Sequence, residues 1–324
     1  MKLVLIVMIP AHNEEASIGE VIRRIPRDLE RCEVKVLVVD DGSTDRTAAV
    51  AREYRADYLI NLGARRGLGT AFSIGLNGAL SHGADIVVLI DADGQYDPEQ
   101  IPALVEPIVR GGADIVLGSR FAGWIEEMPL RKRIGNQIAT AVTSQLTGLD
   151  ISDAQTGFRA FSREAAMRLN IFGGYNHAQQ TIIQAAQKNL RVVEVPISFR
   201  KRVHGESRLI SSLPVYVYGA GAAILRTYRD YRPLPVFLTI GAILFLAGLG
   251  FGFRVLIHFF QTGQVSPYMP SAILTAVLVI LGFQVSFLAL VADMIGSMRT
   301  IQEETLYLLR SMRPNSPEDG EKYS

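Results

Sequence analysis

Residues 87–98 read VVLIDADGQYDP, and this stretch decides the fold. An apolar run of β type ends in two carboxylates, Asp91 and Asp93, and a Pro-Glu pair beginning at Pro98 then starts a helix. In an open α/β sheet, ligands bind at the carboxyl ends of the strands, so both carboxylates should project into a crevice. Hard oxygen ligands of this kind suit Mg²⁺ or Mn²⁺ that carries the phosphates of a substrate.

The Asp-x-Asp-Gly string also has simpler interpretations. Asp and Gly are favoured in turns because of their backbone geometry, and a turn without a ligand stays open as an alternative. A calcium-binding EF-hand loop is excluded, because it needs Gly at its sixth position and Glu at its twelfth. Counted from Asp91, Gly94 is fourth and Pro102 is twelfth.

The composition points to an α/β domain with additional apolar sequence. The chain has 324 residues, 48% of them hydrophobic, and a mean hydropathy of +0.21. The apolar excess lies in residues 234–257 and 271–292, each long enough to cross a bilayer, with a buried core hairpin as the alternative. A net charge of +1 argues against a nucleic-acid partner, and the single cysteine, Cys32, excludes an intramolecular disulfide.

Short β-rich runs alternate with segments of helical spacing through the first half of the chain. This alternation predicts βαβ units and a doubly wound, mostly parallel sheet. The strands are expected at residues 3–9, 34–39, 86–90 and 115–118, and the helices at 16–25, 45–54, 68–80, 99–110 and 134–146.

Polar residues follow the other strands at the same edge of the predicted sheet. The adjacent acids Asp40 and Asp41 are expected to hydrogen-bond a base or ribose, whereas capping of the next helix is the alternative role for Ser43 or Thr44. Residues 63–71 (GARRGLGTA) supply glycines and two arginines at a helix start, which allows a phosphate-bearing ligand to approach the backbone. The stretch matches neither a Rossmann fingerprint nor a P-loop, so a dinucleotide dehydrogenase and a P-loop enzyme are excluded.

Basic residues gather in the second half of the predicted domain and toward the apolar segments. Clusters at 131–133 and 200–208 suit an anionic lipid headgroup or phosphate; a solvated face is the alternative, and we expect it for Lys132. Residues 209–231 combine an apolar stripe with tyrosines and arginines, which predicts an interfacial helix or, alternatively, a soluble amphipathic one. Arginines flank the two spans and residues 258–270 contain no Lys or Arg, so both termini should be cytoplasmic.

Together, these motifs resemble the inverting family 2 glycosyltransferases with the GT-A fold, and more narrowly the polyprenyl-phosphate sugar synthases of the dolichol-phosphate mannosyltransferase type. The resemblance runs from Met8 to about Arg208, and the two-helix tail is similar to that of the multi-spanning members. It implies a GT-A catalytic domain at 1–208, an interfacial segment at 209–232, a transmembrane hairpin at 233–298 and a cytoplasmic helix with a disordered tail at 299–324.

The resemblance also assigns roles to individual residues. It implies a donor site of Pro10, Asn13, Glu14, Asp40, Asp41, Gly67, Gly69, Thr70 and Asp91, and a metal site of Asp91, Asp93 and Gln95. It implies phosphate-binding arginines at Arg120 and at Arg131 or Arg133, and a lipid-phosphate region at Arg200, Arg202 and Ser207. The sequence departs from the family at His12, where Tyr is common, and at Thr156-Gly157, where Ser-Gly is common.

The implied reaction moves a sugar from a GDP-mannose or UDP-glucose type of donor to polyprenyl phosphate at the cytoplasmic face of the cell membrane. An acceptor phosphate is already anionic at pH 7, so it needs cations rather than a strong base. Asp153 is the candidate base if the acceptor is instead a lipid or glycan hydroxyl; otherwise it caps a turn or holds an arginine. Glycines at 241, 248, 250 and 252 allow close helix approach, so a homo-oligomer is also open.

Overall fold

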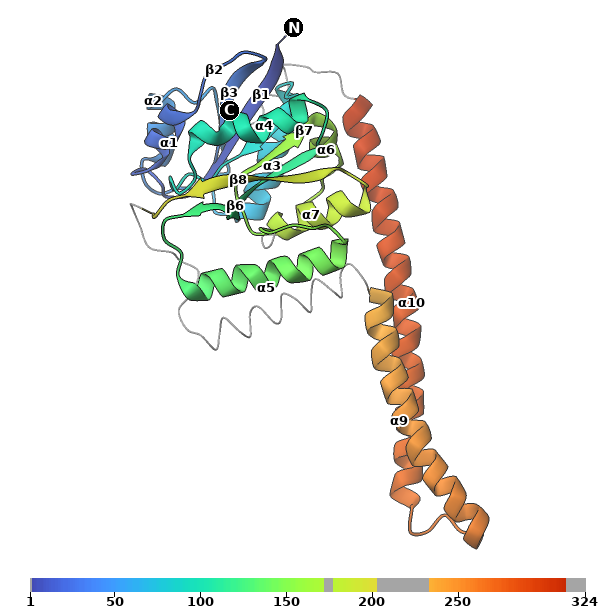
Figure 1. Cartoon of the computed structure of the whole chain (residues 1–324). Coiled ribbons are helices and arrows are strands. Elements are labelled where there is room, and N and C mark those ends of the chain that lie inside the picture. Colours follow the sequence, from blue (N-terminus) through green and yellow to red (C-terminus); the bar gives the residue numbers. More distant parts are fainter. Residues whose placement is uncertain (1, 172–176, 203–232, 313–324) are drawn as a thin grey trace. The chain divides into compact units, whose positions relative to one another are not determined.

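The computed structural model describes residues 2–171, 177–202 and 233–312 (Figure 1). The chain divides into a first unit, Met1–Ser211 with Leu306–Ser324, and a second unit, Ser212–Thr305. The predicted interfacial segment at 209–232, the candidate residue Ser207 and the predicted tail after 312 lie outside the described residues.

The first unit is built on one eight-stranded sheet with the order β2-β3-β1-β5-β7-β6-β8, and β4 pairs with β3. Pairing is parallel between β1 and both β3 and β5, between β3 and β4, and between β6 and β8, whereas β7 runs antiparallel to β5 and β6. The strands are β1 Leu3–Ala11, β2 Asp28–Leu29, β3 Cys32–Asp40, β4 Tyr58–Asn61, β5 Ile86–Leu89, β6 Ile115–Ile125, β7 Arg159–Ser162 and β8 Val192–Phe199.

Helices cover both faces of this sheet, as the doubly wound prediction requires. Side chains alternate along β1, so that Leu5, Val7 and Ile9 pack in one core and Ile6 and Met8 in the other. The first core includes α1, α2 and α4, and the second α3, α6 and α7. The helices are α1 Ile18–Arg24, α2 Thr47–Glu53, α3 Leu68–Ser81, α4 Ile101–Val109, α5 Leu130–Thr147, α6 Arg163–Arg168 and α7 His177–Gln187.

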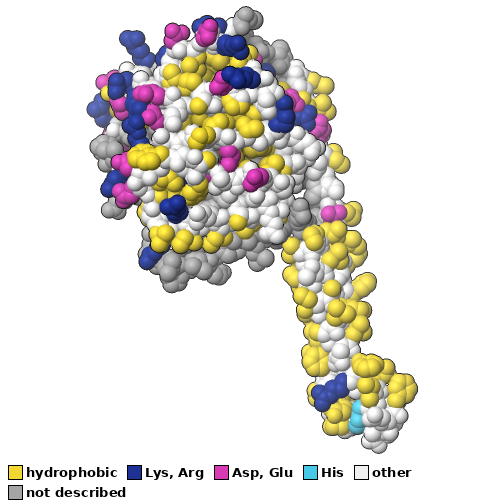
Figure 2. Space-filling model, viewed as in Figure 1, with side chains coloured by type: hydrophobic (Ala, Val, Ile, Leu, Met, Phe, Trp, Pro, Cys, Tyr) yellow, Lys and Arg dark blue, Asp and Glu magenta, His cyan; other side chains and the backbone are white. Residues whose placement is uncertain are grey.

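The second unit contains α9 (Pro233–Thr262) and most of α10 (Met269–Met312), two helices long and apolar enough to cross a membrane. Hydrophobic side chains cover their surface (Figure 2), which argues against a buried core hairpin. A Cβ added to Gly241 would lie 2.9 Å from the carbonyl oxygen of Gly282, so glycine permits the close helix approach here. Gly248 and Gly252 also face α10, whereas a Cβ on Gly250 would meet nothing within 4 Å.

The end of α10 belongs to the first unit. Arg310 Nη1 donates hydrogen bonds to the carbonyl oxygens of Met167 and Leu169, at 2.8 and 3.1 Å, and to Asn170 Oδ1 at 2.9 Å. The Tyr307 hydroxyl lies 3.1 Å from the Glu164 carboxylate. The helix continues through the boundary predicted at 298/299. Its last turns contact α6 and the residues that follow α6.

Candidate functional site

Asp91 and Asp93 lie directly after β5, at the edge of the sheet where the sequence predicts a ligand crevice. Burial and the charge of Asp93 raise the pKa of Asp91 to about 7. Burial also raises the pKa of Asp93, although the hydrogen bond from the Gln95 backbone, at 3.1 Å, opposes the shift. Two neighbouring carboxylates that resist ionisation in this way favour a bound cation.

This donor set fits Mg²⁺ or Mn²⁺ shared with a substrate. In the three described ranges, no group of three or more His, Cys, Asp or Glu side chains is placed to hold a metal ion. Magnesium sites with one or two carboxylates are completed by water and substrate phosphates. Gln95, predicted as a further metal-site residue, uses its side-chain Nε2 to donate to the Arg200 carbonyl oxygen at 3.2 Å.

Gly157 packs directly against the Asp91 carboxylate. A Cβ built on Gly157 would overlap Asp91 Oδ2 and lie 2.8 Å from Asp91 Cγ. The backbone N–H of Gly157 donates to the Tyr96 hydroxyl at 2.8 Å, and Tyr96 is itself 3% exposed. Burial raises the pKa of Tyr96 to about 12, so the hydroxyl stays protonated. The sequence singles out Thr156-Gly157 only as a departure from the family, and Tyr96 not at all.

We expect Gly157→Ala to displace the Asp91 carboxylate and to lower kcat roughly 100-fold, because small misplacements of reacting groups have effects of this size. Gly112→Ala is the matched control, since its added Cβ would lie 3.4 Å from the Pro107 carbonyl oxygen, at the margin of ordinary contact. Steady-state kinetics on both variants would test this expectation. A Gly157→Ala protein with wild-type kcat would show that the contact does not position Asp91.

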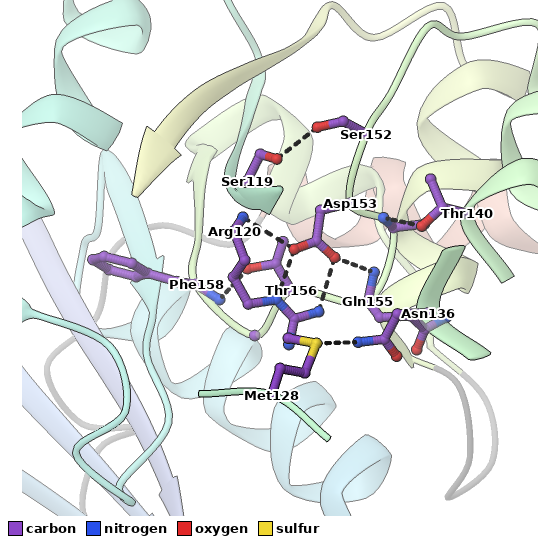
Figure 3. A network of polar contacts seen from close by, with 12 residues as sticks. Ser119, Arg120, Met128, Asn136, Thr140, Ser152, Asp153, Gln155, Thr156 and Phe158 are labelled. Carbon is purple, nitrogen blue, oxygen red and sulfur yellow. Dashed lines mark hydrogen bonds and ion pairs between the residues drawn. The ribbon is translucent and has the colours of Figure 1, made fainter. Parts of the chain in front are cut away.

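A buried ion pair between Arg120 and Asp153 lies at the centre of the network in Figure 3. Arg120 Nε and Nη2 donate to the two Asp153 oxygens at 2.7 and 2.8 Å, and the Arg120 backbone N–H donates to Oδ2 at 3.1 Å. Burial opposes the charge on Arg120, but Tyr96 and Asp153 outweigh it and raise the pKa of the guanidinium. This geometry favours a positioning role for Asp153, in which it orients Arg120. It disfavours the alternative role of Asp153 as a general base.

Three further residues fix the turn at 152–157. Glu194 on β8 accepts the backbone N–H groups of Ser152 and Asp153 at 2.8 and 3.0 Å. Arg159 is 1% exposed and donates to the carbonyl oxygens of Ala154 and Thr156, both at 2.9 Å. The Thr140 hydroxyl accepts the Ala154 N–H at 3.0 Å. The sequence analysis assigns a role to none of these three residues.

The predicted lipid-phosphate cations lie beside acidic residues of the site. Arg202 contacts the Glu14 carboxylate, and its Nη1 lies 4.0 Å from Asp93 Oδ2. Arg200 Nη2 donates to Asp97 Oδ2 at 2.8 Å, and Arg24 pairs with the other oxygen of Asp97. The structure therefore brings Arg202 to the carboxylate pair, whereas Arg200 serves an ion pair at the start of the following helical turn.

The basic cluster at the start of α5 contains one inward-facing cation, Lys132. The sequence analysis expected Lys132 to lie on a solvated face, and this prediction was wrong. Lys132 is half-buried, its Nζ lies 5.8 Å from the Phe199 ring centroid, and burial lowers its pKa. Arg131 and Arg133 are exposed. Arg133 and Arg120 line one cavity of about 460 Å³ together with Phe121, Gly123, Ile125, Glu126, Glu127 and Met128.

The predicted donor residues form interlocked loops at the ends of β1 and β3. Asn13, with φ of 54°, accepts the Thr44 N–H at 2.8 Å and donates its own to the Ser43 hydroxyl at 3.0 Å. The Asp41 oxygens accept the N–H groups of Arg66 and Gly67 at 2.6 and 2.9 Å. Asp41 thus pins the glycine-rich loop, and a direct contact with a base stays a prediction. The other predicted donor residues lie in or beside these loops: Pro10 at the end of β1, Asp40 bonded to the Ser43 N–H, and Gly69 and Thr70 in the first turn of α3.

Comparisons with known proteins identify the family of the chain. The model of the family "Glycosyl transferase family 2" matches residues 6–169, about half of the chain. The model "Glycosyltransferase family 2 C-terminal transmembrane region" matches residues 217–296. The chain is also similar to glucosyl-3-phosphoglycerate synthase from Mycobacterium tuberculosis, solved with Mn²⁺, UDP-glucose and phosphoglyceric acid, with a TM-score of 0.51, 26% identity, and coverage of 64% of this chain and 73% of that one.

The chain matches two relatives of assigned activity over most of their length. Polyprenol monophosphomannose synthase from Mycolicibacterium smegmatis is 32% identical over 218 residues, which cover 64% of this chain and 81% of that protein. UDP-N-acetylglucosamine–dolichyl-phosphate N-acetylglucosaminyltransferase from Methanococcus voltae is 32% identical over 211 residues, covering 59% and 83%. These matches confirm the resemblance and the GT-A fold class, and the chain belongs to glycosyltransferase family 2.

Proposed function

We propose that the protein transfers a sugar from a nucleotide-sugar donor to polyprenyl phosphate, with inversion at the anomeric carbon. One observation carries the proposal: Arg202 lies beside Asp93, so a cation suited to an acceptor phosphate adjoins a carboxylate pair suited to a metal-bound diphosphate. Both relatives above are named for transfer to a polyprenyl or dolichyl phosphate. The two apolar helices would keep the enzyme in the bilayer that contains such a lipid.

The site needs no strong base for this reaction. An acceptor phosphate oxygen would form the new bond to the anomeric carbon while the bond to the nucleoside diphosphate breaks and its electron pair leaves with the diphosphate oxygen. Arg120, Lys132 and Arg202 would hold the two phosphate groups in line. When held by Asp91 and Asp93, a divalent ion supplies positive charge toward the leaving diphosphate.

A hydroxyl acceptor with Asp153 as base is the less favoured function. Both oxygens of Asp153 already accept hydrogen bonds from Arg120, and the side chain is 0% exposed. A base must reach the proton that it removes, either directly or through one water. We therefore propose that Asp153 positions Arg120.

The charge distribution around the apolar helices supports a cytoplasmic active site. Arg299 and Arg310 lie in the C-terminal part of α10, after the apolar stretch at 271–292, and Arg313 comes next, whereas residues 258–270 at the opposite end of the hairpin contain no Lys or Arg. By the positive-inside rule, we propose that both termini and the first unit lie in the cytoplasm, where nucleotide sugars are available.

A panel of donors would test the proposal and name the sugar. Purified full-length protein in detergent would receive polyprenyl phosphate, Mg²⁺ or Mn²⁺, and radiolabelled GDP- and UDP-sugars in turn. We expect one donor to transfer label into the organic phase, only with metal, and the product to show the inverted anomeric configuration by NMR. Metal-independent transfer or a retained configuration would contradict the mechanism.

A further inference from the structure

The last turns of α10 contact the residues that follow α6. Arg310 is half-buried and, like those residues, belongs to the first unit. Its Nη1 atom donates to the carbonyl oxygens of Met167 and Leu169 and to Asn170 Oδ1. A cation that satisfies the carbonyl groups at the end of a helix explains the first two bonds, because these groups have no partner within the helix. The bond to Asn170 goes beyond such a cap.

Asn170 leads from this contact into the interior of the unit. It is 3% exposed, and its backbone N–H donates to Gln184 Oε1 at 2.9 Å. Gln184 Nε2 donates in return to the Asn170 carbonyl oxygen at 2.5 Å. Gln184 lies on α7, one turn beyond Thr181, whose hydroxyl accepts a hydrogen bond from Arg159. Gln184, Thr181 and Arg159 are each 1% exposed, and we refer to these three residues and Asn170 as the buried network.

The buried network ends at the candidate site. Arg159 donates to two carbonyl oxygens of the turn at 152–157, both at 2.9 Å. In the same turn, Asp153 accepts the hydrogen bonds that orient Arg120 (Figure 3). A buried polar group that loses its partner is costly, so displacement of one member of the network displaces the next. The contacts of Arg310 therefore extend, residue by residue, to Arg120.

We propose that Arg310 is a positioning residue: through the buried network, it holds the turn at 152–157, and hence Arg120, in place for sugar transfer. The proposal rests on the proposed function, in which Arg120 binds phosphate. α10 begins in the second unit and ends in the first, so the helix that would cross the membrane also supports a residue of the candidate site. A cap on α6 alone would give Arg310 no effect on the reaction in folded protein.

Asn170→Leu separates the network from the cap. The substitution nearly keeps the size of the side chain and leaves both carbonyl acceptors of Arg310 in place, but it removes the acceptor Oδ1. We expect kcat to fall about 10-fold in full-length protein that circular dichroism shows to be folded, and Arg310→Gln to have the same effect. Arg27→Gln is the matched control, since Arg27 donates to the Arg55 carbonyl oxygen at 2.9 Å on the surface, and its kcat should not change.

A double-mutant cycle with Thr181→Val tests whether these residues act as one network. The valine keeps the size of the side chain and removes the hydroxyl that accepts from Arg159. We expect Thr181→Val and Arg310→Gln each to lower kcat about 10-fold, and the double variant to lose little more than either, because the network is already broken. A loss of about 100-fold in the double variant, or an unchanged kcat in folded Asn170→Leu, would overturn the proposal.

Hydrogen exchange follows the network without reference to activity. The backbone N–H groups of Ser152 and Ala154 are hydrogen-bonded, so their exchange reports on order in the turn. In Arg310→Gln, mass spectrometry should show several-fold faster exchange at 152–157 and unchanged exchange in β3. Faster exchange at 163–171 alone would show a cap on α6 and would overturn the proposal. If the wild type transfers no sugar, the proposed function fails, and exchange still decides whether Arg310 supports the turn.

Discussion

Asp93→Ala should reduce sugar transfer by roughly 1,000-fold, the loss typical when charge stabilisation of a transition state is removed. The substitution takes away one of the two carboxylates that we propose hold a divalent ion beside the donor diphosphate. Binding of Mn²⁺, followed by electron paramagnetic resonance in the presence of the nucleoside diphosphate, should weaken in parallel. The measurement of transfer would use the donor identified in the panel.

The fold itself should survive this change. Burial raises the pKa of Asp93, so its charged form is less stable in the folded protein than in the unfolded chain. That penalty is absent at low pH and grows as the pH rises above the ordinary range of a carboxyl group. At pH 7 the thermal midpoint of Asp93→Ala should therefore equal or exceed that of the wild type. Glu53→Ala, which removes an exposed carboxylate on α2, is the control for transfer. Full activity in Asp93→Ala would exclude the carboxylate pair as the metal site.

Arg120→Met should remove both activity and stability. It deletes the cation that we propose binds phosphate and leaves Asp153 charged and buried without its partner, with side chains that are 4% and 0% exposed in the wild type. Breaking a buried ion pair on one side costs about 3–5 kcal/mol, and we expect a loss of transfer of roughly 100-fold or more. Circular dichroism melting and transfer kinetics would measure the two effects separately.

A second substitution separates these effects. In Arg120→Met with Asp153→Asn, the buried charge is gone, so the thermal midpoint should recover most of its loss while transfer stays low. Recovery of transfer along with stability would mean that Arg120 matters only for folding. If Asp153→Asn alone abolished transfer without loss of Arg120 order or stability, Asp153 would be the base after all.

The central part of the fold follows from local sequence signals. β1 and β3 are long apolar runs, β5 and the start of β6 are short runs without a polar side chain, and the intervening helices have clear periodicity, so these elements were predicted within a few residues. β4 (YLIN) and β7 (RAFS) are short and include polar residues, and β8 contains Pro196, which lowers its strand signal. The antiparallel insertion of β7 between β5 and β6 depends on long-range contacts, which local sequence patterns do not reveal.

The location of Asp91 and Asp93 just after β5, at the predicted edge of the sheet, could be predicted because an acidic pair after an apolar strand is a clear local signal; the roles of Asp91, Asp93 and Arg120 stay predictions. The site was not predictable where function depends on contacts between distant segments. Gly157 and Tyr96 are 61 residues apart and meet only in the folded protein. Similarly, Lys132 faces inward between two exposed arginines. The rotation of α5 about its own axis, set by packing in the folded protein, decides which of the three consecutive cations faces inward.

The choice of acceptor tests the proposed function most directly. Purified full-length protein, the labelled donor and metal would be offered polyprenyl phosphate or the corresponding polyprenol, and label in the lipid fraction would be counted with Asp93→Ala as the blank. Transfer to the phosphate alone, giving a product that mild acid cleaves back to sugar and lipid phosphate, is the result that we predict. Transfer to the alcohol, or to neither lipid despite measured donor binding, would contradict it.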